Sequence, residues 1–133
     1  MLWLADARLA AAVSNSGGLG IISPLAGMDR HGDRVANLKQ QVGRVRELTD
    51  KPFGVNIPLD LPQSPEMIDL LYSEKVPIVV TAAGDPGIYT ELLKTAAIKV
   101  LHVVSSVRQA KIASSQNVDG IIAEGVEAGG QRC

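Results

Sequence analysis

The sequence predicts an α/β fold in which about five parallel strands alternate with helices in a single domain, residues 1–133. Three observations predict it. Short apolar runs rich in β-branched residues recur along the chain, and they are apolar on both faces, as in strands buried between layers. Stretches with helical spacing separate these runs. From the run at Phe53 onward, strand centres lie roughly 20 to 25 residues apart, which is typical of a β-α repeat with right-handed crossovers.

The first expected element is a helix over residues 6–14. Its predicted apolar side consists of Leu9, Ala12 and Val13. The pair Gly17-Gly18 follows and favours a left-handed C-terminal cap. Helical spacing predicts four further helices, over residues 34–48, 65–74, 86–97 and 106–116. Ser64-Pro65 and Asp85-Pro86 are each typical of an N-cap with proline in the first helical position.

The five strands are expected over residues 19–22, 53–57, 77–81, 99–104 and 119–123. Their similarity to one another favours an arc of a (β/α)8 barrel over a doubly wound sheet. A whole barrel needs about 250 residues, so the prediction is an incomplete barrel. A small open α/β sheet, complete in itself, is the alternative that the pattern leaves open.

Composition excludes several classes of partner. The formal net charge is -1 and no run of like charge exceeds two residues, which gives no reason to expect nucleic acid or an anionic membrane. No apolar run approaches the length of a membrane span. Residues 1–13 carry Asp6 and Arg8 and lack a basic leader, so they are not expected to be a secretion signal. Cys133 is the only cysteine, which favours a reducing compartment and a cytoplasmic location.

In parallel α/β folds, ligands meet the carboxyl ends of the strands. Asn56 is an amide late in an apolar strand, and two roles are open for it. It satisfies a neighbouring backbone group, or it hydrogen-bonds the edge of a heterocyclic ring. Glu124 and Glu127 lie on the loop after the last strand and are candidates for acid–base work. Gly129 and Gly130 on that loop would let the backbone approach a ligand closely.

Other polar residues have ordinary structural explanations. Ser105 and Ser106 are expected to cap the helix that follows them. On its position in the sequence alone, Lys111 of that helix is expected to be an ordinary solvent-exposed lysine. His102 lies within a strand and is expected to be a satisfied core histidine, and His31 lies in a polar loop. Neither histidine has partners at the spacing of a metal site, so no metal is expected.

The blocks ADARLAAAVSNSGGLGII, LTDKPFGVNIPL, PIVVTAAGDPG, IKVLHVVSSVRQAK and DGIIAEGVEAGG occur in this order and cover nearly all of the chain. Together they resemble the nitronate monooxygenase family, formerly called 2-nitropropane dioxygenases. They also resemble its relative, the flavin-type enoyl-acyl-carrier-protein reductase. The resemblance implies an FMN-binding (β/α)8 barrel. It implies an oxidoreductase that oxidises alkyl nitronates with O2 or, in the alternative, reduces enoyl thioesters with NAD(P)H.

The resemblance also implies roles for individual residues. Asn56 would be a flavin contact. Lys111 matches a lysine that approaches the flavin, and Glu124 stands where the family has an acidic residue near the cofactor. Gly129 and Gly130 would belong to the loop beside the isoalloxazine ring.

The sequence departs from the family pattern in three respects. The family's EAGG is typically followed by a catalytic histidine, and Gln131 stands there; glutamine cannot exchange a proton near neutral pH. An opening strand with a Pro-Met segment is absent, and so are the last strands with their phosphate-binding loops. A truncated product is therefore expected, one that binds flavin weakly or not at all and has little turnover. A third hypothesis is a non-catalytic fragment that self-associates through open sheet edges.

Overall fold

The computed structural model describes residues 3–28 and 32–128, and in them five helices alternate with five strands. The strands are β1 (Gly20–Ile22), β2 (Phe53–Pro58), β3 (Ile78–Ala82), β4 (Lys99–Val104) and β5 (Gly120–Ala123). The helices are α1 (Ala7–Asn15), α2 (Arg34–Leu48), α3 (Ser64–Ser73), α4 (Gly87–Thr95) and α5 (Val107–Ser115). The predicted alternation is confirmed, with boundaries that differ by a few residues.

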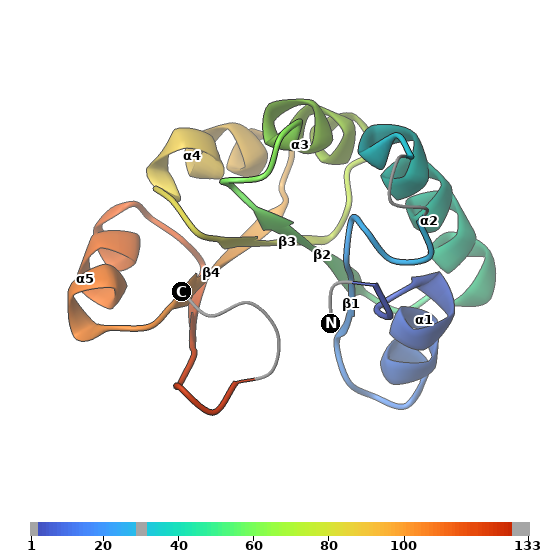
Figure 1. The fold of residues 1–133 in the computed structure, drawn as a ribbon, viewed down its shortest axis with the longest axis horizontal. Helices are drawn as coiled ribbons and strands as arrows, with labels where there is room; N and C mark the ends of the chain where they lie inside the picture. The colour runs from blue at the N-terminus through green and yellow to red at the C-terminus, as the bar shows by residue number, and fades with distance from the viewer. Residues whose placement is uncertain (1–2, 29–31, 129–133) are drawn as a thin grey trace.

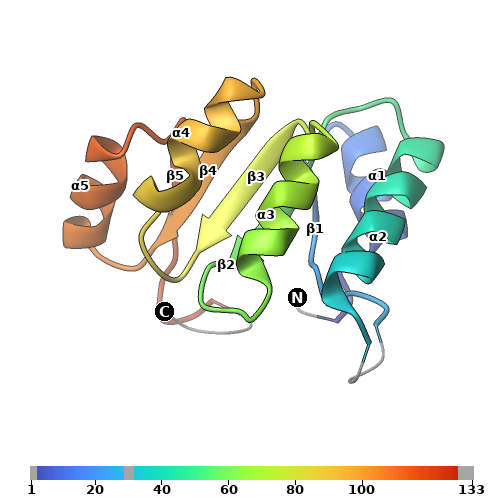
Figure 2. The same ribbon diagram turned by 90° about the horizontal axis from the view of Figure 1, so that it is seen from above.

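The strands form one parallel sheet in the order of the sequence, β1-β2-β3-β4-β5. Right-handed crossovers between neighbouring strands place every connecting helix on the same side of a sheet. Figures 1 and 2 show this arrangement: the helices follow the outer side of a curved sheet, and its inner side carries none. A doubly wound sheet would carry helices on both faces, so the structure confirms an arc of a (β/α)8 barrel.

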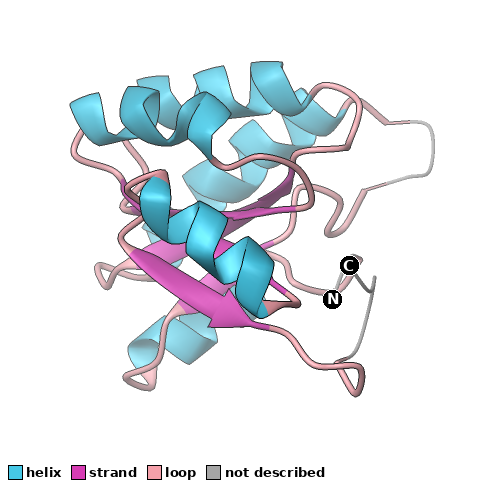
Figure 3. Ribbon diagram, turned by 90° about the vertical axis from the view of Figure 1, so that its left-hand side faces the viewer, coloured by secondary structure: helices cyan, strands magenta, loops and turns pink. Residues whose placement is uncertain are grey.

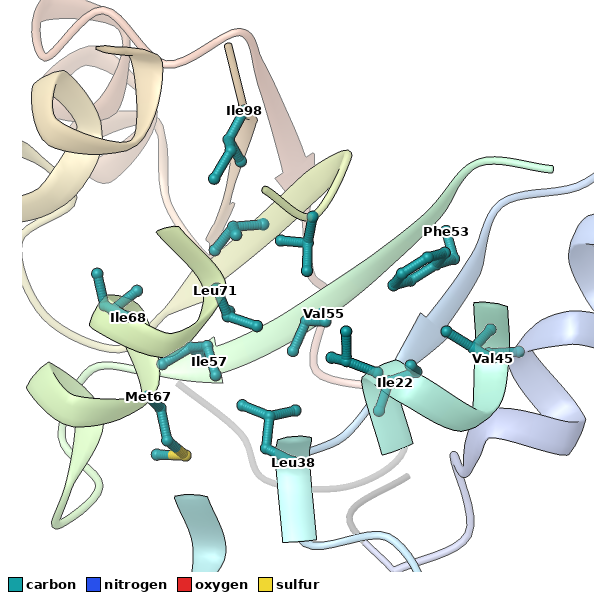
Figure 4. Packing of buried hydrophobic residues seen from close by; sticks show 14 of the residues in the cluster. Ile22, Leu38, Val45, Phe53, Val55, Ile57, Met67, Ile68, Leu71 and Ile98 are labelled. Carbon is teal, nitrogen blue, oxygen red and sulfur yellow. The ribbon is translucent and has the colours of Figure 1, made fainter. Parts of the chain in front are cut away.

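The hydrophobic core lies between the sheet and the helices, on the convex side of the arc. Val55 and Ile57 of β2 project into it beside Leu71 and Met67 of α3, and all four side chains are fully buried. Figure 4 shows these side chains converging from the two layers. Because side chains alternate along a strand, the residues between them point to the concave side.

The concave side is apolar but packed less completely. Its residues include Ile21, Ile78, Leu101 and Val103, which are half-buried and do not belong to the core cluster. Gly54 lies on the same side, since a Cβ there would meet Ile21 Cδ1 at 2.6 Å. The fold therefore has one well-packed core, on one side of its sheet.

The predicted apolar side of the first helix is wrong. α1 buries Ala7, Ala10, Ala11 and Ser14, whereas Leu9 and Val13 are each 39% exposed. The physical reason is close packing against β1, because a Cβ at Gly20 would collide with the backbone of Ala10. Only small side chains fit where helix and strand lie so near, so the larger residues face outward.

Of the caps predicted for α1, α3 and α4, the glycine cap of α1 is confirmed. Gly17 follows α1 with a φ of +91°, and the N–H of Gly18 donates to the carbonyl of Val13. Before α4, the N-cap residue is Pro86 and not the predicted Asp85, although Asp85 accepts a hydrogen bond from the N–H of Gly87, where the helix begins. Ser64 is not a cap: it lies inside α3, and its hydroxyl donates to the carbonyl of Leu59.

Candidate functional site

Asn56 is the polar side chain that the structure places on the concave side of β2. Its neighbours Val55 and Ile57 point into the core, so Asn56 points the opposite way. In the parallel register it lies beside Val80 of β3. Asn56 is half-buried, whereas Val80 is 3% exposed. An amide therefore faces the inner, apolar side of the arc.

The side chain of Asn56 forms no hydrogen bond with any residue in the described part of the chain. The first of its two predicted roles, satisfying a neighbouring backbone group, is therefore not seen. An amide offers two donors and two acceptor lone pairs, and buried ones are generally satisfied. Asn56 retains this whole capacity for a bound molecule or water on the concave side.

The backbone conformation of the loop after β3 accounts for the small residues in it. Ala83 and Gly84 both have a positive φ, of 49° and 106°. The N–H of Leu59 donates to the carbonyl of Ala82 at 2.8 Å, which ties this loop to the end of β2. A Cβ at Gly84 would approach Leu59 Cβ at 3.2 Å. A tight turn thus accounts for the small residues, without a need for a ligand.

Glu124 follows β5 and is half-buried, and its N–H donates to the carbonyl of Val104. The carboxylate of Glu127 lies over Gly125. In register, Asn56 shares a row with Val80, Leu101 and Gly120 across the sheet. Glu124 is three strands away and four residues further along, which separates it from Asn56 by on the order of 10 Å or more. The two can contact one extended ligand but not each other.

Lys111 lies elsewhere. It is exposed and sits two residues before Ala113, the residue of α5 that is buried against the sheet. Two residues correspond to about 200° around a helix, so Lys111 is on the side of α5 turned away from the sheet. The structure does not bring Lys111 and Asn56 together.

The predicted serine cap of α5 is confirmed. The hydroxyl of Ser106 accepts a hydrogen bond from the N–H of Gln109. In return, the amide oxygen of Gln109 accepts from the N–H and the hydroxyl of Ser105. This arrangement is a variant of the capping box, in which the side chain of Gln109 reaches the residue before the N-cap.

The remaining predicted site residues, Gly129, Gly130 and Gln131, lie outside the described residues, and so does His31. Among the described residues no group of three or more histidine, cysteine or acidic side chains could hold a metal ion. No helix in the described part of the chain has the length and apolarity to cross a membrane.

His102 lies on the convex side of β4 and is 5% exposed. Its Nδ1 lies 2.8 Å from the hydroxyl of Thr81, a partner in the neighbouring strand that the sequence did not reveal. Burial lowers the pKa of His102, and the charge of Asp85 opposes this effect. His102 also lines a groove of about 260 Å³, together with Pro86 and Ile112 from either side of the α4–α5 gap.

Acidification should destabilise the fold through His102. Because its pKa in the folded chain lies below the ordinary value of 6.5, the unfolded chain takes up the proton first as the pH falls. The free energy of unfolding should therefore fall as the pH drops below about 6.5. Urea denaturation at several pH values measures this dependence, and His102→Asn should weaken it. An equal dependence in the variant would contradict the assignment to His102.

A further groove among the described residues is outside the barrel, between α1 and α2. It measures about 690 Å³ and its lining includes Arg8, Asn37 and Arg44. None of the predicted site residues lines it. The concave side with Asn56, and not the groove between α1 and α2, is thus the candidate site.

Comparison with known proteins agrees with this architecture. The family model described as nitronate monooxygenase matches residues 1–69. A "(3aS,4S,5R,7aS)-5-hydroxy-7a-methyl-1-oxo-octahydro-1H-indene-4-carboxyl-CoA dehydrogenase" from Rhodococcus jostii is 36% identical over 130 residues, covering 98% of this chain and 35% of that protein. A nitronate monooxygenase from Pseudomonas aeruginosa is 27% identical over 171 residues, covering 99% of this chain and 47% of that protein.

A solved structure superposes closely. FabK from Thermotoga maritima matches 98% of this chain and 40% of its own, with a TM-score of 0.89 and 41% identity. The chain thus spans between about a third and a half of the length of these relatives. The family model covers more than half of the 133 residues. On this match, and on the arc of parallel strands that it accompanies, the chain belongs to the nitronate monooxygenase family.

Proposed function

We propose that this chain is part of an FMN-dependent nitronate monooxygenase, in which the concave side of the sheet receives the flavin. The observation that carries the proposal is the amide of Asn56, half-buried on that side and without a hydrogen bond among the described residues. Its paired donors and acceptor suit the edge of a heterocyclic ring, which also presents both kinds of group. When bound, FMN would supply the redox chemistry, and the protein would supply position and polarity.

The other candidate residues fit the flavin unequally. Glu124, beyond the end of β5, is within reach of an extended ligand that also contacts Asn56. Gly129 and Gly130 belong to the proposal on sequence alone. Lys111 does not fit as the structure stands, because it is exposed on the side of α5 turned away from the sheet.

Gln131 restricts the substrate. A base is needed to remove a proton from a neutral nitroalkane, and a glutamine cannot serve as one. An alkyl nitronate has already lost that proton, so its oxidation with O2 does not call for a base at this position. The nitronate, rather than the neutral nitroalkane, is therefore the proposed substrate class.

A second candidate is a flavin-dependent reductase of enoyl thioesters that uses NAD(P)H. The Rhodococcus relative supports it, since its name specifies the coenzyme A thioester of a carboxylic acid, and its identity to this chain exceeds that of the Pseudomonas enzyme. Reduction of the flavin by NAD(P)H, followed by reoxidation with an enoyl thioester and not with a nitronate, would favour this candidate.

An FMN titration followed by NMR tests the proposed site, because it detects weak binding. We expect saturable shifts of the Asn56 side-chain amide, and in Asn56→Leu an FMN dissociation constant raised roughly tenfold or more. The same variant should keep or increase the free energy of unfolding, because no hydrogen bond within the described chain is lost.

Asn37 provides the matched control. Its amide donates to the carbonyls of Pro24 and Ala26. Asn37→Leu should therefore reduce stability by about 1 kcal/mol and leave FMN binding unchanged. The absence of any FMN-dependent shift in the chain, or equal FMN affinity in Asn56→Leu, would refute the proposed site.

A further inference from the structure

The groove between α4 and α5 contains a ring nitrogen that the fold leaves without a partner. His102 is 5% exposed, and its Nδ1 faces the hydroxyl of Thr81. Its Nε2 forms no hydrogen bond in the described part of the chain. Among the described residues, Arg34 Nε is the one fully enclosed side-chain nitrogen or oxygen without a hydrogen bond. Nε2 of His102 is therefore not enclosed, and it is reached from the groove that His102 lines.

Thr81 determines which nitrogen of the ring carries the hydrogen. Burial lowers the pKa of His102 below its ordinary value, so the ring is neutral near pH 7. The hydroxyl of Thr81 has one hydrogen and donates it to the carbonyl of Leu101 at 3.3 Å. It can then only accept from His102, so Nδ1 carries the hydrogen and Nε2 carries a lone pair. A hydrogen-bond acceptor on a nearly buried side chain thus opens into the groove.

Two other polar side chains line the groove. The amide oxygen of Gln109 is occupied by Ser105, whereas its NH2 group has no partner among the described residues. The carboxylate of Asp85 accepts from the N–H of Gly87, and its charge acts on His102. The rest of the lining is small or apolar: Gly84, Pro86 and Ile112. The groove thus offers an acceptor, a donor and a negative charge beside apolar walls.

The groove does not depend on the ends of the chain. Its walls come from one segment, residues 84–112, which contributes the loop after β3, the strand β4 and the helices α4 and α5. These two helices are neighbours in the outer layer, and Figure 3 views the molecule from this end of the arc. The groove is on the convex side of the sheet, opposite the side proposed for the flavin.

We propose that this groove binds a neutral ligand that carries a primary carboxamide on an apolar ring. The N–H of the carboxamide donates to Nε2 of His102, and its carbonyl accepts from the NH2 group of Gln109. The charge of Asp85 disfavours a carboxylate in the same place. The volume of about 260 Å³ lies just below the usual range of ligand pockets and suits a single ring.

Titration of the intact chain with benzamide, followed by 15N NMR of the histidine side chains, tests the proposal. Without ligand, Nε2 of His102 should resonate as a nitrogen with a lone pair and Nδ1 as a nitrogen with a hydrogen. Benzamide should shift Nε2 saturably, with a dissociation constant on the order of 1 mM for so small a probe. Benzoate has the same size but no N–H and a negative charge, so it should leave Nε2 unshifted. Excess FMN should not compete with benzamide.

Gln109→Glu removes the donor without removing the cap. Its carboxylate can still accept from Ser105, as glutamate does in a capping box, so the fold should be kept. The dissociation constant of benzamide should rise roughly tenfold or more. Gln40→Glu is the matched control, because Gln40 is exposed on α2, outside this groove, and the change of charge is the same. It should leave benzamide binding unchanged.

Four results would each overturn the proposal. They are a hydrogen on Nε2 of His102 in the free chain, no response of Nε2 to benzamide, equal binding of benzoate and benzamide, and unchanged benzamide affinity in Gln109→Glu. Competition by FMN would place benzamide on the concave side instead, and would also overturn it. Since the two sites lie on opposite sides of the sheet, failure of this proposal leaves the proposed flavin site untouched.

Discussion

Gly20→Ala should lower the free energy of unfolding by about 3 kcal/mol, since the new methyl group has no space. A Cβ at Gly20 would collide with the carbonyl oxygen of Ala10, and its next neighbours are also backbone atoms of Ala10. Backbone atoms cannot rotate aside as a side chain does. α1 would have to move away from β1 as a unit and would lose the contacts of its small buried residues.

Gly43→Ala is the matched control for this prediction. Gly43 lies inside α2, and a Cβ there would meet nothing within 4 Å. Alanine should therefore raise the free energy of unfolding by about 1 kcal/mol, through its higher helix propensity. Urea denaturation of both variants measures the contrast. If Gly20→Ala is as stable as the unaltered chain, α1 does not pack on β1 as the structure shows.

The close contact at Gly20 also explains what the sequence could and could not predict. The order of elements follows from apolar runs and helical spacing, and these are local properties of the chain. Which side of α1 is buried is not local. The spacing of Leu9 and Val13 predicted that they would form the buried side of α1. Because α1 and β1 lie so close together, alanines are buried between them instead.

The candidate site was predictable to the extent that it depends on strand alternation. Asn56 stands between Val55 and Ile57 in an apolar strand, which is enough to place it on the side opposite their own. That its amide has no hydrogen bond among the described residues required coordinates. The position of Lys111 depends on how α5 is rotated against the sheet, and Thr81 is opposite His102 only because of the register of β3 and β4. Neither is encoded in a short sequence motif.

Because the core lies on one side of the sheet, the same substitution should have different effects on stability at isoleucines on opposite faces of the sheet. Ile57→Ala should cost about 3 kcal/mol, because Ile57 is fully buried between β2 and α3 and its removal leaves a cavity. Ile78→Ala, on the concave side of β3, should cost about 1 kcal/mol or less. Ile78 is half-buried and outside the core cluster, so its side chain gives up fewer contacts.

The same substitution at both positions keeps the chemistry constant, so the difference in the free energy of unfolding reports packing alone. Urea denaturation of the two variants at one chain concentration measures it. Equal losses would mean that the concave side is packed as densely as the convex side, by a ligand, by another part of the chain or by a second molecule. Since the proposed flavin would occupy that side, excess FMN should increase the loss for Ile78→Ala and leave the loss for Ile57→Ala unchanged. If excess FMN changed the loss of unfolding free energy equally in the two variants, or in neither of them, the concave side would not be the place where FMN binds.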